Sequence, residues 1–133
     1  MIKLLLFLVL IVVNQCAQAE WIGIGKTQDG VGHFYANPRS IENSDDIVRV
    51  WTLADFEKIQ KVSKETKAFK SYMLRLEIDC IKNMSRYISL FVFAENMGKG
   101  EAVLSDNHEY AWEPTSDSRI LKLFEVYACK KKK

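Results

Sequence analysis

The chain has 133 residues, 48% of them hydrophobic, and its 19 basic and 17 acidic side chains give a formal net charge of +2. This length suits a single globular domain, and the composition excludes a disordered or low-complexity chain. A charge so close to balance gives no support for nucleic acid as a partner.

The start of the chain is typical of a secretory signal peptide. Lys3 is followed by an unbroken apolar run over residues 4–13 and then by a closing A-x-A tripeptide. The alternatives are a buried helix or a membrane span, but a span needs about 20 apolar residues. We predict cleavage between Ala19 and Glu20, which leaves residues 20–133 as one mature domain without a transmembrane segment.

The three cysteines fit this prediction. If Cys16 leaves with the signal peptide, Cys80 and Cys129 remain as an even pair in an oxidising compartment. Cys16 is a poor site for lipid attachment, because lipoprotein processing requires a small residue just before the cysteine and Gln15 stands there. We therefore predict a Cys80–Cys129 disulfide; the alternative is two unpaired buried cysteines.

Segments of alternating polarity follow in the first three quarters of the mature chain. Charged residues 57–67 are predicted to form a solvated loop, and residues 42–46 a solvated acidic turn. The predicted strands lie at residues 21–25, 32–37, 47–56, 71–80 and 86–96, with a sixth after the turn that starts at Met97.

The clearest strand reads SYMLRLEIDC. Its first face carries Tyr72, Leu74, Leu76, Ile78 and Cys80, and its second carries Met73, Arg75, Glu77 and Asp79. This alternation favours an antiparallel sheet with one packed face and one wet face. Residues 86–96 are apolar on both faces, which predicts a strand covered on both sides.

The period becomes helical after Trp112. Pro114 and the polar residues 115–118 favour a helix start, and residues 130–133 are lysines that suit the negative end of the helix dipole. One apolar stripe is formed by Ile120, Leu121, Phe124, Tyr127 and Ala128. We predict an α+β domain: one antiparallel sheet of about six strands, with a C-terminal helix packed on one face and linked to it by the disulfide.

The sequence predicts no catalytic, cofactor-binding or metal site. An enzyme would need a cluster among His33, His108, Asp79 and nearby acids, and two isolated histidines are too few for a zinc site. The GKT at residues 25–27 has no glycine at the start of a phosphate-binding loop, because position 20 is Glu. We interpret residues 130–133 as a solvated helix end, with an anionic partner as the alternative.

Three tryptophans, Trp21, Trp51 and Trp112, are expected in the core. The acidic segment at residues 42–46 lacks the ligand spacing and central glycine of an EF-hand calcium loop.

The mature chain resembles the bacterial surface-adhesin protein E family. The motifs that carry the resemblance are EWIGIG, FYANPRSI, VRVWTLADFEKIQ, SYMLRLEIDC, MGKGEAV, WEPTSDS and LKLFEVYAC. The resemblance implies a six-stranded antiparallel sheet tied to a C-terminal helix by a disulfide. It also implies binding to host matrix or serum proteins, and a homodimer, but assigns no binding residue.

These observations lead to one main functional hypothesis and one alternative. The main hypothesis is an exported, non-enzymatic envelope protein of a Gram-negative bacterium, in the periplasm or at the cell surface. It would bind a protein, either a host matrix protein or an envelope component, by strand-edge pairing or exposed aromatic and basic side chains. The alternative is a periplasmic small-molecule or lipid-binding module.

Overall fold

A computed structural model describes residues 20–61, 63 and 67–131. The predicted signal peptide, residues 1–19, lies outside the described residues. The strands are β1 (Ile22–Lys26), β2 (Gly32–Ala36), β3 (Glu42–Ser44), β4 (Ile47–Gln60), β5 (Phe69–Asp79), β6 (Met84–Phe93), β7 (Ala102–Asp106) and β8 (Glu113–Pro114). The helix is α2 (Arg119–Lys130), and three short 3₁₀ turns lie at Pro38–Ser40, Asn96–Gly98 and Thr115–Asp117.

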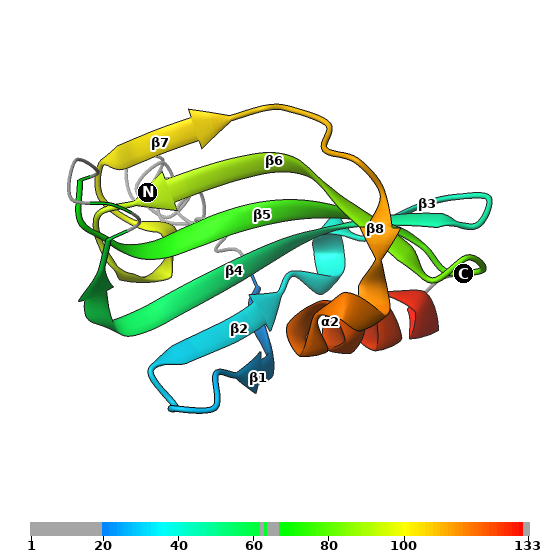
Figure 1. Ribbon diagram of the computed structural model, residues 1–133, viewed down its shortest axis with the longest axis horizontal. Coiled ribbons are helices and arrows are strands. Elements are labelled where there is room, and N and C mark those ends of the chain that lie inside the picture. Colours follow the sequence, from blue (N-terminus) through cyan, green and yellow to red (C-terminus); the bar gives the residue numbers. More distant parts are fainter. Residues whose placement is uncertain (1–19, 62, 64–66, 132–133) are drawn as a thin grey trace, which may run out of the picture.

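All strands belong to one antiparallel sheet (Figure 1). The main path runs β1-β2-β4-β5-β6-β7, which confirms the predicted sheet of about six strands. Two short strands were not predicted: β3 pairs with β4, and β8 pairs with β6. The acidic segment predicted as a solvated turn therefore forms β3 and the tight turn that connects it to β4.

β4 is longer than the sequence indicated. It continues through residues 57–60, which the charge pattern placed in a loop. The backbone explains the difference, because Glu57 N–H donates to the Val31 carbonyl at 3.0 Å and Gln60 pairs with Phe69 across to β5. Charged side chains such as Glu57 are compatible with this extension because they remain exposed. The loop prediction was wrong for these four residues.

The core lies between one face of the sheet and the helix. Its buried members are Ala36, Val48, Val50, Leu76, Ile78, Phe124 and Ala128. Leu76 and Ile78 lie on the predicted packed face of β5. The Phe34 and Phe124 rings meet edge to face at 6.4 Å, which joins β2 to α2.

Helix α2 begins where the sequence indicated. Ser118 caps it by accepting a hydrogen bond from Leu121 N–H at 3.3 Å. Phe124 and Ala128 of the predicted stripe are buried, and so is Glu125, which the stripe did not include. Lys122 Nζ lies 2.7 Å from the Glu125 carboxylate, so this acid enters the packed side of the helix with a cation beside it.

The helix covers only one part of the sheet. Figure 1 shows α2 beside β1 and β2, while β6 and β7 lie at the far side of the sheet. Most of β6 is consequently half-buried, and only Ser85 and Val92 within it are buried. The expectation that this strand is covered on both faces was wrong, because its apolar composition does not place a helix above it.

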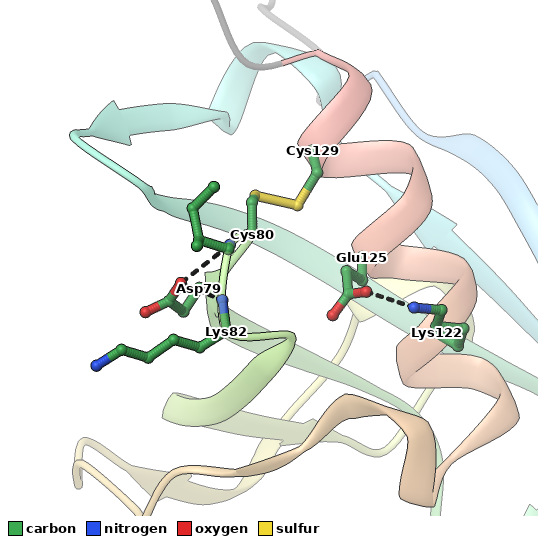
Figure 2. The surroundings of a disulfide bond; sticks show 7 residues. Asp79, Cys80, Lys82, Lys122, Glu125 and Cys129 are labelled. Atoms are coloured by element: carbon green, nitrogen blue, oxygen red, sulfur yellow. Dashed lines mark hydrogen bonds and ion pairs between the residues drawn. A yellow bond between two sulfur atoms is a disulfide. The ribbon is translucent and has the colours of Figure 1, made fainter.

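The disulfide between Cys80 and Cys129 is present, with the Cα atoms 5.9 Å apart (Figure 2). Cys80 directly follows β5, and Cys129 lies in the last turn of α2. Asp79 Oδ1 organises the adjacent turn by accepting hydrogen bonds from the N–H groups of Ile81 and Lys82. The bridge therefore fixes the C-terminal end of the helix to a turn that is itself hydrogen-bonded.

Replacing both Cys80 and Cys129 with serine should lower the free energy of unfolding by about 4 kcal/mol, the loss of chain-entropy restraint expected for a closed loop of about 50 residues. Urea denaturation of the mature protein and the double variant measures the difference. Reduction of the unsubstituted protein should give a similar loss. Equal stability of the oxidised and reduced proteins would contradict the account.

Candidate functional site

An apolar groove lies on the helix side of the sheet, where α2 does not reach. Its volume is about 490 Å³. We call it the β7 groove, and its lining residues are Phe69, Tyr72, Leu74, Tyr87, Leu90, Val92, Leu104 and Tyr110. Leu104 and Tyr110 are 46% and 42% exposed, so the groove is open to solvent along this border.

The strand registers bring these side chains together. Leu74 of β5 lies opposite Leu90 of β6, and Val92 of β6 lies opposite Leu104 of β7. Because side chains on one face of neighbouring strands form a continuous layer, these pairs make an unbroken apolar surface across three strands. The groove is thus a direct product of the alternation that also forms the core.

Three tyrosines of the groove stay neutral well above physiological pH. Burial raises the pKa of Tyr72 to about 12 and also raises the pKa of Tyr87. The pKa of Tyr110 is raised mainly by the hydrogen bond that its hydroxyl donates to Asp106 at 2.6 Å. The groove therefore presents uncharged aromatic surface rather than acid–base groups.

The groove borders a second hollow that lies against the helix. Tyr72, Leu74 and Tyr87 line both spaces, and the second space has a volume of about 200 Å³. Leu121 and Phe124 of α2 line it from the helix side. The arrangement offers apolar contact along the sheet and beneath the start of the helix.

The edge of the sheet lies beside the groove. β7 is the last strand in the sheet order, and among the described residues it pairs only with β6. Leu104 belongs to both features, since it lies in β7 and lines the groove. An extended segment that paired with β7 could place alternate side chains toward the groove.

The opposite face of the sheet has a different character. The rings of Trp51 and Phe91 lie 5.9 Å apart, and the Arg75 guanidinium lies 6.0 Å from the Trp51 ring. Further along this face, Arg86 lies 4.6 Å from the Trp112 ring. Trp51 and Trp112 are half-buried, as is Trp21, so the expectation that the three tryptophans occupy the core was wrong.

Glu77 joins two arginines on this face. Its carboxylate accepts hydrogen bonds from Arg49 at 2.7 Å and from Arg86 at 2.6 Å. Burial alone would raise the pKa of Glu77, but the bonds from Arg49 and Arg86 outweigh it, and the pKa lies below its ordinary value. The ionised acid links the central strands β4, β5 and β6.

Replacing Glu77 with glutamine should destabilise the fold by about 2 kcal/mol at neutral pH, because charge-assisted hydrogen bonds to a buried group are lost. Because the pKa of Glu77 is lower in the folded state than in the unfolded state, its ionised carboxylate stabilises the fold at any pH above the unfolded-state pKa, near 4.5. This stabilisation is lost as the pH falls through the folded-state pKa. The difference between the two proteins should therefore shrink in acid.

Denaturation curves at a series of pH values test this prediction. Glu101→Gln is the control, since Glu101 pairs with Lys67 at 3.0 Å on the exposed surface and should contribute little. A Glu77→Gln penalty that stayed constant from neutral to acid pH would refute the proposed role of the ionised carboxylate.

The groups considered for catalysis do not come together. His33 of β2 pairs with Asp55 of β4, whereas Asp79 of β5 pairs with Ile47 of β4. Asp55 and Ile47 are eight residues apart in the same strand, so His33 and Asp79 are separated by about 26 Å along the strand direction. His33 instead lies 3.2 Å from Glu57, and the ring of His108 packs on that of Tyr110.

No three metal-ligating side chains gather anywhere in the described part of the chain. Gly25 and Lys26 of the GKT segment belong to β1, and the Thr27 hydroxyl donates to Asp29 in the following turn. This segment is a strand followed by a turn rather than a phosphate-binding loop.

The family model of surface-adhesin protein E matches residues 21–130. The chain belongs to the surface-adhesin protein E family. A search of curated proteins found no match.

Solved structures support the same protein E fold. The structure of Haemophilus influenzae protein E is 14% identical, has a TM-score of 0.62, and aligns over 86% of each chain. A second crystal form is 15% identical with a TM-score of 0.63, over 86% of this chain and 90% of that one. Protein E from non-typeable Haemophilus influenzae is 16% identical with a TM-score of 0.60, over 86% and 78%.

These comparisons confirm the family resemblance and the fold drawn from the sequence. The domain is of the surface-adhesin protein E type. Among the described residues, no helix is long and apolar enough to cross a membrane. Sequence reasoning missed the β7 groove. The available signal was that residues 86–96 carry apolar side chains on both faces of the strand. The sequence predicted only one helix to cover them.

Proposed function

We propose that this protein is an exported, non-enzymatic binding domain that recognises a protein partner at the β7 groove. The observation that carries the proposal is the continuity of an apolar groove with a sheet edge that no described strand pairs with, joined at Leu104. Membership of a surface-adhesin family supports a binding role at the bacterial surface or in the periplasm. A host matrix protein or an envelope component fits this setting.

The partner would supply an extended segment. Its backbone would hydrogen-bond to the outer edge of β7, and its alternate apolar side chains would enter the groove. Backbone pairing gives affinity with little dependence on sequence, while the groove selects the side chains. The neutral tyrosines favour apolar and aromatic residues over charged ones.

Replacing Leu104 with aspartate should weaken partner binding at least about tenfold, because it removes buried apolar contact and places a charge in the groove. Purified host extracellular-matrix proteins and isolated outer-membrane proteins serve as the panel, measured by surface plasmon resonance with the mature chain. Ile59→Asp is the matched control, since Ile59 is 63% exposed and lies outside the groove.

Two outcomes would count against the proposal. One is saturable binding that both aspartate variants retain, which would place the contact elsewhere. The other is the absence of micromolar binding to every member of the panel. Hydrogen exchange adds a direct readout, since a strand-pairing partner should slow the exchange of β7 amides.

A small-molecule or lipid-binding role is the second candidate. It is favoured by the groove volume of about 490 Å³, since ligand pockets typically span about 300–1,000 Å³. The adjoining hollow against α2 would lengthen the site for a chain-like ligand. Failure of the mature protein to take up a fluorescent fatty acid would argue against this candidate.

We further propose that export involves removal of residues 1–19 and that the mature domain starts at Glu20. The basic start, apolar run and A-x-A tripeptide support it. N-terminal sequencing of the protein recovered from cell fractions tests the cleavage site, and the fractions themselves separate periplasm from surface. The homodimer implied by the family resemblance is tested by light scattering of the same material.

A further inference from the structure

The charges of the mature chain are strongly segregated along the sequence. Residues 119–133 carry six basic and one acidic side chain, a net charge of +5. Residues 20–118 carry 12 basic and 16 acidic side chains, a net charge of −4. The near-neutral total therefore conceals a cationic C-terminal segment attached to an anionic body.

The fold turns four of these cations outward. Arg119, Lys122, Lys130 and Lys131 are all exposed on α2 and its C-terminal cap. The single acid of the segment, Glu125, is only 4% exposed. The outer surface of the helix thus carries cations with no exposed carboxylate of its own, and we call it the cationic helix face.

One apolar side chain lies among the charges. Val126 is 43% exposed and does not belong to the buried side of the helix. The apolar stripe itself is unavailable, because Phe124 and Ala128 are packed against the sheet. Any contact made by the outer face must therefore be mainly electrostatic, with Val126 as a small apolar addition.

The face is held rigidly in place. Cys129 is bonded to Cys80 at one end of α2, and Arg119 donates to the Lys26 carbonyl at 2.6 Å near the other end. Figure 2 shows Lys122 directed toward Glu125, a pairing that holds this side chain along the helix. Fixed cations lose less conformational entropy on binding than cations on a free tail.

We propose that the cationic helix face docks the protein on an anionic membrane surface, with its lysine and arginine side chains against the phosphate groups of lipid headgroups. Cationic side chains near such a surface are attracted by about 1 kcal/mol each. The anionic body is repelled by the same surface, so the charge segregation orients the molecule with α2 toward the lipid.

A membrane fits these features better than an acidic protein does. A protein partner normally matches a pattern of both charge signs, whereas this face offers only cations and one small apolar side chain. Val126 can enter the headgroup region without a pocket to receive it. An acidic macromolecule in solution is the competing outcome of the test.

The experiment is co-sedimentation of mature protein, residues 20–133, with vesicles. Vesicles of phosphatidylglycerol mixed with phosphatidylcholine should bind the protein, and vesicles of phosphatidylcholine alone should not. Binding should weaken as salt rises, because the Debye length falls from about 10 Å at 0.1 M to about 3 Å at 1 M.

Substitution locates the contact. Replacing the four cations of the cationic helix face, Arg119, Lys122, Lys130 and Lys131, with glutamine should weaken vesicle binding about fivefold for each charge removed. The matched control removes the same number of charges from exposed lysines of the body, namely Lys58, Lys61, Lys67 and Lys99. This control makes the body more anionic and should weaken binding far less than the helix variant does, because the body charges lie farther from the lipid and are screened by salt.

A single substitution in the described helix provides a second test. Val126→Asp places an anion in the centre of the cationic helix face and should weaken vesicle binding at least about fivefold, whereas Ile59→Asp on the body should have a much smaller effect. Circular dichroism and an intact Cys80–Cys129 disulfide establish that each variant is folded.

Three results would overturn the proposal. They are binding to phosphatidylcholine alone, equal loss in the helix and body variants, and binding to soluble heparin without binding to vesicles. The test is separate from that of the β7 groove, because Leu104→Asp should retain vesicle binding while it loses the protein partner.

Discussion

The packing of one short helix on a much larger sheet determines which apolar side chains of this protein remain exposed. Twelve residues of α2 span about 18 Å, whereas the fourteen residues of β4 extend over about 46 Å. Phe124 and Ala128 bury the helix against one part of this sheet, and the Cys80–Cys129 bond keeps it there. Because one short helix cannot cover a sheet of six strands whose central members are this long, part of the apolar face must remain open, and the β7 groove is that part.

The same placement sorts the charges. A helix that packs on one side must present its polar side to solvent, and here the only acid, Glu125, is on the packed side with Lys122 beside it. The remaining cations are left on the outer surface without acidic neighbours on the helix. On the far face of the sheet an acid is again buried, since Glu77 lies between Arg49 and Arg86 and its charge is satisfied within the fold.

How much of this was predictable follows from the range of each interaction. The alternation through Leu76 and Ile78 predicted the sheet, and the helical spacing of apolar residues after Trp112 predicted the helix, because both patterns are local in the sequence. The disulfide followed from counting the cysteines. Burial of Glu77 was not predictable, because it depends on Arg49, which is 28 residues away in the chain. Strand β6 shows the same limit: its composition indicates apolar faces, but only the position of α2 decides which of them stays uncovered.

The β7 groove and the cationic helix face share no residue, and Figure 1 shows β7 at one edge of the sheet and α2 beside β1 and β2 toward the other edge. A body with a net charge of −4 would be held away from an anionic surface that attracts the helix. The edge at β7 would then point away from the lipid and remain free for a partner. An electrostatic contact through α2 would be reversible, and it would respond to ionic strength, whereas a covalent lipid anchor would not.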